Sequence, residues 1–411
     1  MLDGNLKFFA HRASPSAPRH LIETVWGTVN APAGIGQGDG GLRMGLATEV
    51  LVVGGGPAGL AAAIAARRKG FQVTVADGAK PPIDKACGEG LMPHTLAGLR
   101  DLGVIVSPNE GRFFVGIRFL DESTSTEAKF LREYGLGLRR TILHQKLAEA
   151  AEECGVNLSW DTRVTGLSSS GAIVGGKLIQ ARWIIGADGL HSRIARWSGL
   201  GAHNQRSARF AQRRHYRVKP WTDFVEIYWG RKSQAYVTPL AGNEACVVLI
   251  SRDAKMTFEE ALQEFPKLAA SLYKAEVSSL QRGAVTAMCG RDRVYRGNVA
   301  LIGDASGSVD AITGEGLGLS FRQALALADA MQNGALGKYQ LAHRQIARRP
   351  NFMARLLLLL DRAAPLRRRV LRGLANDPGL FGRLLELNGG EVSPATLADA
   401  SARLGWQLLT A

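Results

Sequence analysis

The segment DKACGEGLMP, residues 84–93, holds two side chains that can move protons. Cys87 carries a thiol, and Glu89 carries a carboxyl group between two glycines. A thiol here serves redox chemistry or metal binding, or it is only a small apolar side chain in a Gly-rich turn. No ligand set with the spacing of a metal site surrounds it. Cys87 and Glu89 are therefore the candidate catalytic residues, and no metal is expected.

A glycine-rich turn precedes this segment. In VVGGGPAG, the GxGxxG spacing is formed by Gly54, Gly56 and Gly59, with Pro57 and Ala58 between the last two. The first glycine allows a tight turn, the second lets the backbone approach a pyrophosphate, and the third lets a helix pack closely on a strand. The turn follows the strand EVLVV and opens the helix PAGLAAAIAARRKG, whose N-terminus favours phosphate. The pattern predicts a dinucleotide site.

Three further stretches refine the site. Asp77 ends the next strand, FQVTVAD, where an acid accepts hydrogen bonds from a ribose that carries no 2′-phosphate. IIGADGLHSRIAR and NVALIGDASGSVDAITGEGLGLSF follow later in the chain. Taken singly, the aspartate of each could be a simple helix cap. The candidate cofactor residues in these two stretches are Asp188, Gly189, Gly303, Asp304, Gly314 and Gly316.

The three motifs, in this order, resemble those of the FAD enzymes related to p-hydroxybenzoate hydroxylase, over roughly residues 48–335. The resemblance implies FAD, with Asp188 and Gly189 near the flavin and the Asp304 carboxylate accepting from the ribityl hydroxyls. It also implies a cofactor-facing arginine in RRTILH, where Arg140 matches and Arg139 is a close competitor.

The turn TGEGLGL provides its own physical argument. Thr313 offers a helix cap, and the glycines that follow it allow a flat ring to lie against backbone amides. The positive end of that helix would stabilise negative charge on the reduced flavin.

The segments CGEG and TGEG are similar to those of the geranylgeranyl reductase branch of this superfamily. That resemblance implies that Cys87, Gly88, Glu89 and Gly90 lie beside the flavin and the substrate cavity. The chain departs from the aromatic hydroxylases, which commonly have GDAAH, and from the reductases, which often have Pro before Thr-Gly-Glu-Gly. The reaction type therefore stays open.

Three functions are compatible with these motifs. The first is hydride reduction of C=C bonds in a polyprenyl or lipid-like substrate. The alternative is an NAD(P)H-dependent monooxygenase that hydroxylates a hydrophobic phenol or polyketide-like compound, and a third is a non-enzymatic flavin-binding redox or membrane-surface module. No second GxGxxG unit follows, so NAD(P)H would bind transiently as reductant, or a protein would donate electrons. Candidates for the substrate wall are Tyr228, Trp229 and Tyr236, with core packing as the alternative.

These motifs predict an α/β fold. We expect a doubly wound, Rossmann-like FAD-binding domain interleaved with an antiparallel-sheet substrate domain and closed by C-terminal helices. Alternating runs at 208–251 predict the antiparallel sheet, and a helix is expected over 257–273. The expected segments are a disordered or loosely docked extension (1–46), FAD-binding parts (47–112, 140–200 and 296–335), substrate-domain parts (113–139 and 201–295) and a helical region (336–411).

The composition of the chain limits the kinds of partner that the protein can bind. The 411 residues are 46% hydrophobic and carry a net charge of +15, without a Lys/Arg block interleaved with aromatics, so nucleic acid is excluded. The four cysteines are scattered and the longest aliphatic run falls short of a membrane span, which favours a cytoplasmic protein. RPNFMARLLLLLDRAAPLRRRVLRGL predicts a basic amphipathic helix that either packs on the body or lies on an anionic membrane.

Overall fold

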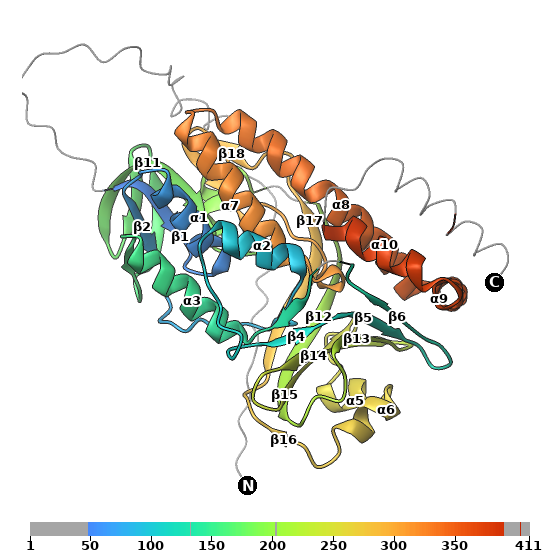
Figure 1. The fold of residues 1–411 in the computed structure, drawn as a ribbon. Helices are drawn as coiled ribbons and strands as arrows, with labels where there is room; N and C mark the ends of the chain where they lie inside the picture. Colours follow the sequence, from blue (N-terminus) through green and yellow to red (C-terminus); the bar gives the residue numbers. More distant parts are fainter. Residues whose placement is uncertain (1–47, 132, 202–203, 390–402, 404–411) are drawn as a thin grey trace, which may run out of the picture. The chain divides into compact units, whose positions relative to one another are not determined.

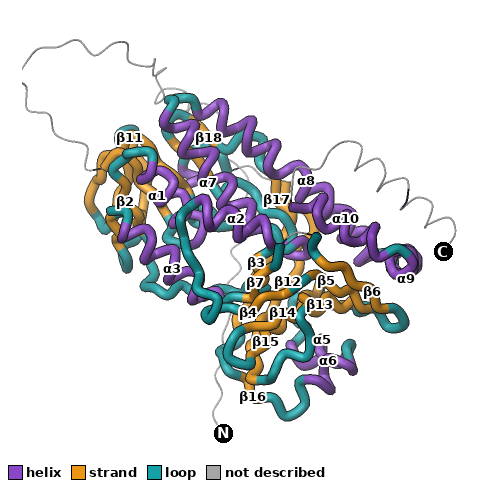
Figure 2. The backbone as a smooth tube through the Cα atoms, viewed as in Figure 1, coloured by secondary structure: helices purple, strands orange, loops and turns teal. Residues whose placement is uncertain are grey.

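The computed structural model describes residues 48–389 apart from 132, 202 and 203, together with residue 403. The predicted extension over residues 1–46 lies outside this range. Two large sheets and one small sheet form the framework, and long helices flank them (Figures 1 and 2). This arrangement confirms the expected α/β fold with parallel and antiparallel sheets and C-terminal helices.

The first sheet is the parallel sheet that the GxGxxG pattern requires. Its strands from β19 to β8 are parallel, and β9 and β10 extend β11 as an antiparallel meander. The strand order is β18 (Tyr295–Arg296), β19 (Val299–Leu301), β11 (Lys177–Gly186), β1 (Thr48–Val53), β2 (Val73–Ala76) and β8 (Asn157–Ser159), with β9 (Val164–Ser168) and β10 (Gly171–Val174) beside β11.

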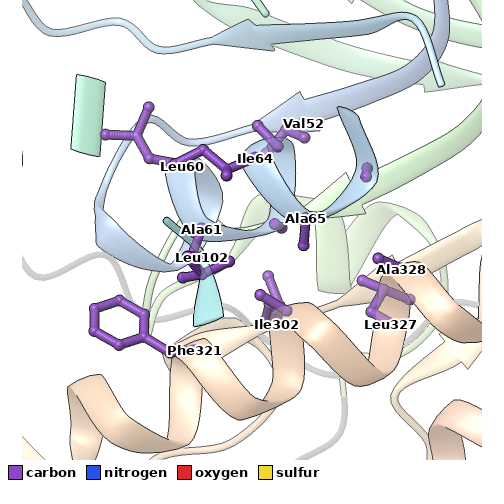
Figure 3. Close-up of a cluster of buried hydrophobic side chains, with 14 of the residues drawn as sticks. Val52, Leu60, Ala61, Ile64, Ala65, Leu102, Ile302, Phe321, Leu327 and Ala328 are labelled. Atoms are coloured by element: carbon purple, nitrogen blue, oxygen red, sulfur yellow. The ribbon is translucent and has the colours of Figure 1, made fainter. Parts of the chain in front are cut away.

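Strand β1 is apolar on both faces because both faces are covered. Val50 and Val52 pack toward α1 (Pro57–Arg68) and α7 (Gly316–Gln332), and Figure 3 shows how small alanines of α1 let these two helices approach. Helix α3 (Arg140–Glu153) also packs on α1. The alternate residues of β1 face β9, β10 and the short helix α4 (Arg193–Trp197), so meander strands, more than helices, cover this second face.

The second sheet is mostly antiparallel and carries the other half of the fold. Its strands alternate between two apolar clusters, as a period of two demands. The order is β16 (Glu276–Val277), β12 (Asn204–Arg217), β15 (Glu244–Ser251), β14 (Ser233–Leu240), β13 (Phe224–Trp229), β5 (Gly116–Leu120) and β6 (Ser125–Lys129), with β17 (Arg282–Gly290) also paired to β12.

The outer face of this sheet is covered by two short helices, α5 (Phe258–Gln263) and α6 (Pro266–Ser271). The single helix expected over 257–273 is therefore wrong. Pro266 cannot donate a backbone hydrogen bond, so the first helix ends before it and the second begins with it.

A three-stranded sheet links the two halves. Strand β7 (Gly135–Gly137) pairs with β3 (Gly90–Leu91) and β4 (Arg112–Phe114), and helix α2 (Pro93–Asp101) lies beside α7. Strands β5 and β6 leave this region and join the second sheet. The chain thus moves between the sheets repeatedly, and the residue boundaries given for each domain part stay predictions.

The C-terminal helices cover part of the inner face of the second sheet. They are α8 (Leu336–Arg362), α9 (Ala364–Asn376) and α10 (Pro378–Gly389). A buried pair, Arg367 with Asp121 at 3.0 Å, ties α9 to the turn between β5 and β6. Among the residues that the structure describes, none of the helices is both long and apolar enough to cross a membrane.

Candidate active site

The GxGxxG turn joins the end of β1 to the start of α1. Gly54 has a φ of +109°, and a Cβ there would lie 2.4 Å from the Ala187 carbonyl oxygen. A Cβ on Gly59 would lie 1.8 Å from the Gly54 carbonyl oxygen. At Gly56, by contrast, no atom of the described chain lies within 4 Å of an added Cβ. The fold therefore requires the first and last glycines, whereas the middle one leaves open space at a helix N-terminus, as a pyrophosphate site needs.

Two side chains hold this turn in place. Asp77 accepts hydrogen bonds from the Gly55 amide at 2.7 Å and the Ala79 amide at 2.8 Å. His144 on α3 lies with Nε2 2.8 Å from the Gly55 carbonyl oxygen. Burial lowers the pKa of His144, so the neutral ring donates from Nε2. The ribose contact of Asp77 stays a prediction, and no pattern in the sequence singles out His144.

The two consecutive arginines at the start of α3 differ sharply. Arg139 makes two hydrogen bonds to the Glu244 carboxylate, at 2.9 and 2.6 Å. Arg140 is buried, and its Nη1 has no hydrogen-bond partner within the described part of the chain. Burial lowers the pKa of Arg140 although Cys87, Asp84 and Glu89 oppose the shift, so the protein compensates this cation only in part. An anionic group of a bound cofactor is a suitable partner for Arg140.

Asp188 has a structural role that accounts for its carboxylate. It accepts from the Ser192 hydroxyl at 2.5 Å and from the amides of Arg193 and Ile194 at 2.6 and 3.2 Å. These amides open α4, whose N-cap is Ser192, so Asp188 holds the start of that helix together with Ser192, close to the capping role that the sequence left open. Gly189, next to it, has a φ of +80°, and its flavin contact stays a prediction.

Asp304 lies in a different environment from Asp188. Gly303, with a φ of +59°, packs against the GxGxxG turn, since a Cβ on it would lie 2.7 Å from the Ala58 Cβ. The Asp304 side chain is exposed, and no donor in the described residues hydrogen-bonds to it, yet surrounding protein raises its pKa against the attraction of Lys85. A carboxylate can be exposed and still have a raised pKa when protein surrounds it on most sides and leaves one side open. Ligand hydroxyls can reach such a carboxylate from the open side.

The TGEG turn forms the start of α7. The helix begins at Gly316 with Glu315 as its N-cap, so the expected cap at Thr313 is wrong. Thr313 instead belongs to the short 3-10 turn Ala311–Thr313, and Gly314 after it has a φ of +67°. No described atom lies within 4 Å of a Cβ on Gly316, so the backbone here also faces open space.

These features fit FAD. Two helix N-termini, at Gly56 and Gly316, present backbone to open space, and within the described residues neither the Asp304 carboxylate nor Arg140 Nη1 has a hydrogen-bond partner. The helix start at Gly56 would bind the phosphates of FAD, and the helix start at Gly316 would contact its flat ring. The Asp304 carboxylate would accept hydrogen bonds from the ribityl hydroxyls. The residues that would hold FAD therefore come from all three motifs and from α3.

The CGEG loop lies on the inner face of the second sheet. The Gly88 carbonyl accepts from the Thr238 hydroxyl at 2.6 Å, and the Cys87 carbonyl accepts from the Cys246 thiol at 3.6 Å. Gly90 begins β3 and approaches Val225. Burial and then the Glu89 charge raise the pKa of the half-buried Cys87 thiol. The thiol is thus protonated at neutral pH.

Glu89 is fully buried and adopts a φ of +58°, which is unusual outside glycine. Its Oε1 accepts from the Arg140 amide at 3.0 Å, and its Oε2 lies 2.6 Å from His215 Nε2. The Leu138 amide donates to its carbonyl at 2.9 Å. These hydrogen bonds offset the cost of the strained backbone at Glu89, and they hold its carboxylate between α3 and strand β12.

His215 is held from its other side by donors. Arg213 Nη1 lies 2.8 Å from His215 Nδ1, and the Ser279 hydroxyl lies 2.7 Å from the same nitrogen. A guanidinium has no acceptor, so Nδ1 accepts and Nε2 carries the proton toward Glu89. Arg213 in turn donates to Asp84 at 2.6 Å. The sequence shows no signal for this network, because its members are far apart along the chain.

Glu89, His215 and Cys246 also form a group of metal-ligand types, with donor atoms within 4.8 Å of one another. The charges around it favour a proton site over a cation site. Arg213 places a positive charge against the ring, and burial keeps the pKa of Cys246 well above that of an ordinary thiol, so the thiolate that would bind metal is disfavoured.

The three aromatic candidates for the substrate wall are not on one face. Tyr228 belongs to the outer cluster, stacks edge-on against Phe265 at 5.9 Å and donates to Glu226, so placing it in the pocket is wrong. Trp229 and Tyr236 belong to the inner cluster, but both are buried. Consecutive residues of a strand point to opposite faces, which separates Tyr228 from Trp229.

Comparison with known proteins agrees with this geometry. The FAD binding domain family matches residues 47–338, which is most of the chain. The chain belongs to this FAD-binding family. It is an FAD-dependent oxidoreductase, as the sequence motifs predicted, and it resembles both reductases and monooxygenases.

Several of the similar proteins are reductases, and others carry the names of a putative FAD-dependent monooxygenase and a putative quinolone synthase. A menaquinone reductase of Mycolicibacterium smegmatis is 29% identical over 350 residues, covering 76% of this chain and 84% of the relative. A digeranylgeranylglycerophospholipid reductase of Methanothermobacter thermautotrophicus is 28% identical over 294 residues, covering 66% and 73%.

Solved structures share the fold. A flavoprotein/dehydrogenase of Cytophaga hutchinsonii superposes with a TM-score of 0.75 at 19% identity, covering 88% of this chain and 98% of that one. The p-nitrophenol 4-monooxygenase of Pseudomonas putida superposes with a TM-score of 0.71 at 17% identity, covering 84% and 99%. At these identities the likeness concerns the fold alone.

Proposed function

We propose that this enzyme reduces carbon–carbon double bonds in a polyprenyl or similarly lipid-like substrate. The observation that carries the proposal is the Cys87 thiol, kept protonated beside Glu89 on the loop between the cofactor motifs and the second sheet. FAD, when bound and reduced, supplies the hydride for such a reduction. The protein must supply the matching proton, and we assign this donation to Cys87.

An apolar substrate suits the surroundings of this thiol. The inner face of the second sheet carries Val225, Ile227 and Val248 beside the CGEG loop. The two relatives named above are named for menaquinone and for digeranylgeranylglycerophospholipid, both of them reductase substrates by name. We infer a substrate of the same chemical class. The electrons come from NAD(P)H bound transiently or from a protein donor.

A monooxygenase acting on a hydrophobic phenol or polyketide-like compound is the second candidate. Its support is the fold that this chain shares with p-nitrophenol 4-monooxygenase. The two candidates differ in their use of the proton donor, because C=C reduction consumes a proton at the substrate carbon. A protonated, half-buried thiol is explained by the first candidate and has no assigned use in the second.

We further propose that the protein contacts anionic membranes through one side of α8. Exposed along this helix are Arg348, Phe352, Arg355, Leu359 and Arg362, which we name the basic face of α8. Phe352 and Leu359 are 65% and 50% exposed, while the opposite side of α8 packs on the second sheet. Exposed apolar and cationic side chains on one helix face suit an anionic lipid surface.

One experiment separates the two reactions. The FAD-loaded enzyme is reduced with NADPH, NADH or dithionite and mixed with geranylgeranyl lipids, menaquinone or long-chain phenols, with and without oxygen. The masses of the products are measured by mass spectrometry. Reduction predicts a gain of two hydrogens per double bond without oxygen and a loss of at least about 100-fold in Cys87→Ala. Gain of one oxygen atom, only in air, would establish the monooxygenase instead.

A further inference from the structure

The residue that precedes helix α7 is a glutamate whose carboxylate does not contact the amides of that helix. Glu315 is the N-cap residue of α7 and is fully buried, but its side chain makes no capping hydrogen bond. A side chain at this position commonly accepts from the amides of the first turn, which have no partner within the helix. The backbone at Gly316 faces open space. Glu315 therefore leaves the first amides of α7 available to a ligand.

A histidine and an arginine hold the Glu315 carboxylate in its position. His94 Nε2, on α2, lies 2.8 Å from Glu315 Oε2, and Arg322 Nη2, about two turns further along α7, lies 3.6 Å from the same oxygen. Burial lowers the pKa of Arg322, while the charge of Glu315 opposes that shift and the charge of Arg349 adds to it. These contacts offset the cost of burying the carboxylate, and they direct it toward α2.

Close packing between α2 and α7 brings His94 within reach of Glu315. A Cβ on Gly318 would lie 2.8 Å from Thr95 Oγ1 and 3.2 Å from His94 Nε2, so a larger residue there would push α2 away. A Cβ on Gly314 would lie 3.2 Å from Met92 Cε. Helix α2, which lies beside α7 in Figure 1, comes directly after β3 in the chain. The contact therefore joins the segment that leaves the CGEG loop to the TGEG turn.

We propose that His94 is a positioning residue that holds the Glu315 carboxylate away from the first turn of α7, so that the amides of this turn stay free for the flavin of FAD. The amino end of a helix stabilises negative charge, which reduced flavin carries. A carboxylate that capped the same amides would use their hydrogen bonds and repel that charge. The His94–Glu315 contact therefore favours flavin reduction, whether the substrate is afterwards reduced or hydroxylated.

A second explanation of the same contact is that it only ties α2 to α7. Both explanations predict a loss of thermal stability when the His94 side chain is removed. They differ in their effect on the cofactor, because a tie between two helices does not depend on where the charge of Glu315 lies relative to the flavin. The midpoint potential of bound FAD separates the two explanations, since it responds to nearby charge.

The variants His94→Ala, His94→Gln and Glu315→Gln, and the combination of His94→Ala with Glu315→Gln, provide the test. Each FAD-loaded protein is reduced slowly without oxygen in the presence of a reference dye, and the flavin and dye spectra give the midpoint potential. Glu226→Gln is the matched control, because this carboxylate is also buried and paired, 2.8 Å from Arg118, but lies on β13 in the second sheet. Thermal unfolding of each protein is measured alongside.

We expect His94→Ala to shift the equilibrium between oxidised and reduced FAD about tenfold toward the oxidised form, which is about 30 mV for two electrons. The carboxylate is then released to cap α7, where it opposes negative charge on the flavin. Glu315→Gln should shift the equilibrium toward reduced FAD, because it removes that charge. His94→Gln keeps an N–H donor for the carboxylate and should stay within about twofold of the wild type. Glu226→Gln should leave the potential unchanged.

The combined variant decides whether His94 acts through Glu315. In the Glu315→Gln background, His94→Ala should cause no further shift toward oxidised FAD, because no charge is left to release. The same shift in both backgrounds would overturn the proposal, and so would a wild-type potential in His94→Ala together with lowered thermal stability. Glu315→Gln tests the proposal even if His94→Ala does not retain FAD, since an unmoved potential in that variant would show that the Glu315 charge does not reach the flavin.

Discussion

Arg139 and Arg140 are consecutive residues, and their side chains have opposite surroundings. Arg139 is paired through two nitrogens with Glu244, whereas Arg140 is buried with Nη1 unpaired in the described structure. The backbone amide of Arg140 also donates to the Glu89 carboxylate, so this residue joins α3 to the CGEG loop. The contrast separates a residue that ties the start of α3 to strand β15 from one whose Nη1 has no partner among the described residues.

Replacing Arg140 with Gln should weaken FAD binding by roughly 10- to 100-fold, because a buried cation facing an anionic ligand contributes about 1.5–3 kcal/mol. Removing this buried and only partly compensated charge should leave thermal stability without FAD unchanged or raise it. Titration of apoprotein with FAD, followed by flavin fluorescence, measures the affinity. Arg139→Gln is the control: it should lower stability and leave FAD affinity within about threefold of the wild type. Equal losses of affinity in both variants would contradict the assignment.

Two glycines of the GxGxxG turn should respond differently to alanine. Gly56→Ala meets no described atom, so the apoprotein should unfold at the wild-type temperature, but the new methyl group would occupy the phosphate space and abolish measurable FAD binding. Gly54→Ala should lower the unfolding temperature of the apoprotein itself, because its φ is +109° and the Ala187 oxygen is 2.4 Å away. Differential scanning fluorimetry with and without FAD checks both. An apo Gly56→Ala as unstable as Gly54→Ala would show that the space is not open.

The motifs allowed the cofactor half of the fold to be predicted because they are local. Around Gly54 a strand, a turn and a helix follow one another within about a dozen residues, so the local sequence is enough to predict their geometry. The continuous apolar run of β1 predicts a strand that is buried on both faces. The substrate half was predicted as alternating strands, and the period of two separates Tyr228 from Trp229. It does not tell which set faces the site, because that depends on where the sheet docks.

The pairing of Glu89 with His215 could not be predicted for a related reason, although Glu89 itself was a candidate catalytic residue. Glu89 and His215 are 126 positions apart, and Arg209 and Asp310, which join β12 to the last motif, are 101 apart. Their pairing depends on the second sheet docking against the motif loops, and no local pattern encodes that. Asp188 shows the converse: the alternative of a helix cap could be stated from sequence, and the hydrogen bonds to the start of α4 then revealed it.

Stability should fall in mild acid because of His343. Its Nε2 lies 2.9 Å from the Ser306 hydroxyl, and burial, with a smaller effect of Arg344, lowers its pKa to about 4. In the unfolded chain the ring titrates near its ordinary value of 6.5, so the unfolded state binds more protons between about pH 6.5 and 4. The contribution of neutral His343 to the free energy of unfolding is therefore fully present above pH 6.5. It is lost as the pH falls through this window, by up to about 3 kcal/mol.

Urea denaturation of wild type and His343→Gln from pH 7.5 to 4 tests this. The difference in the free energy of unfolding between the two proteins should shrink with falling pH, because the glutamine does not titrate. A difference that stays constant across the window would mean that His343 titrates normally in the folded protein.

The basic face of α8 should make membrane binding depend on lipid charge. Arg348→Glu with Arg355→Glu reverses two charges, and at about 1 kcal/mol for each cation near an anionic surface the loss should be at least about 30-fold in partitioning onto vesicles rich in phosphatidylglycerol. Phe352→Ser should weaken binding in vesicles of every salt concentration, because it removes apolar insertion, whereas the arginine variants should lose their effect at high salt. Lys177→Glu with Lys219→Glu, two exposed sites outside α8, matches the charge change and should bind nearly as the wild type does. If the lysine control loses as much vesicle binding as the α8 variant, then the net charge of the protein, and not the basic face of α8, determines membrane binding.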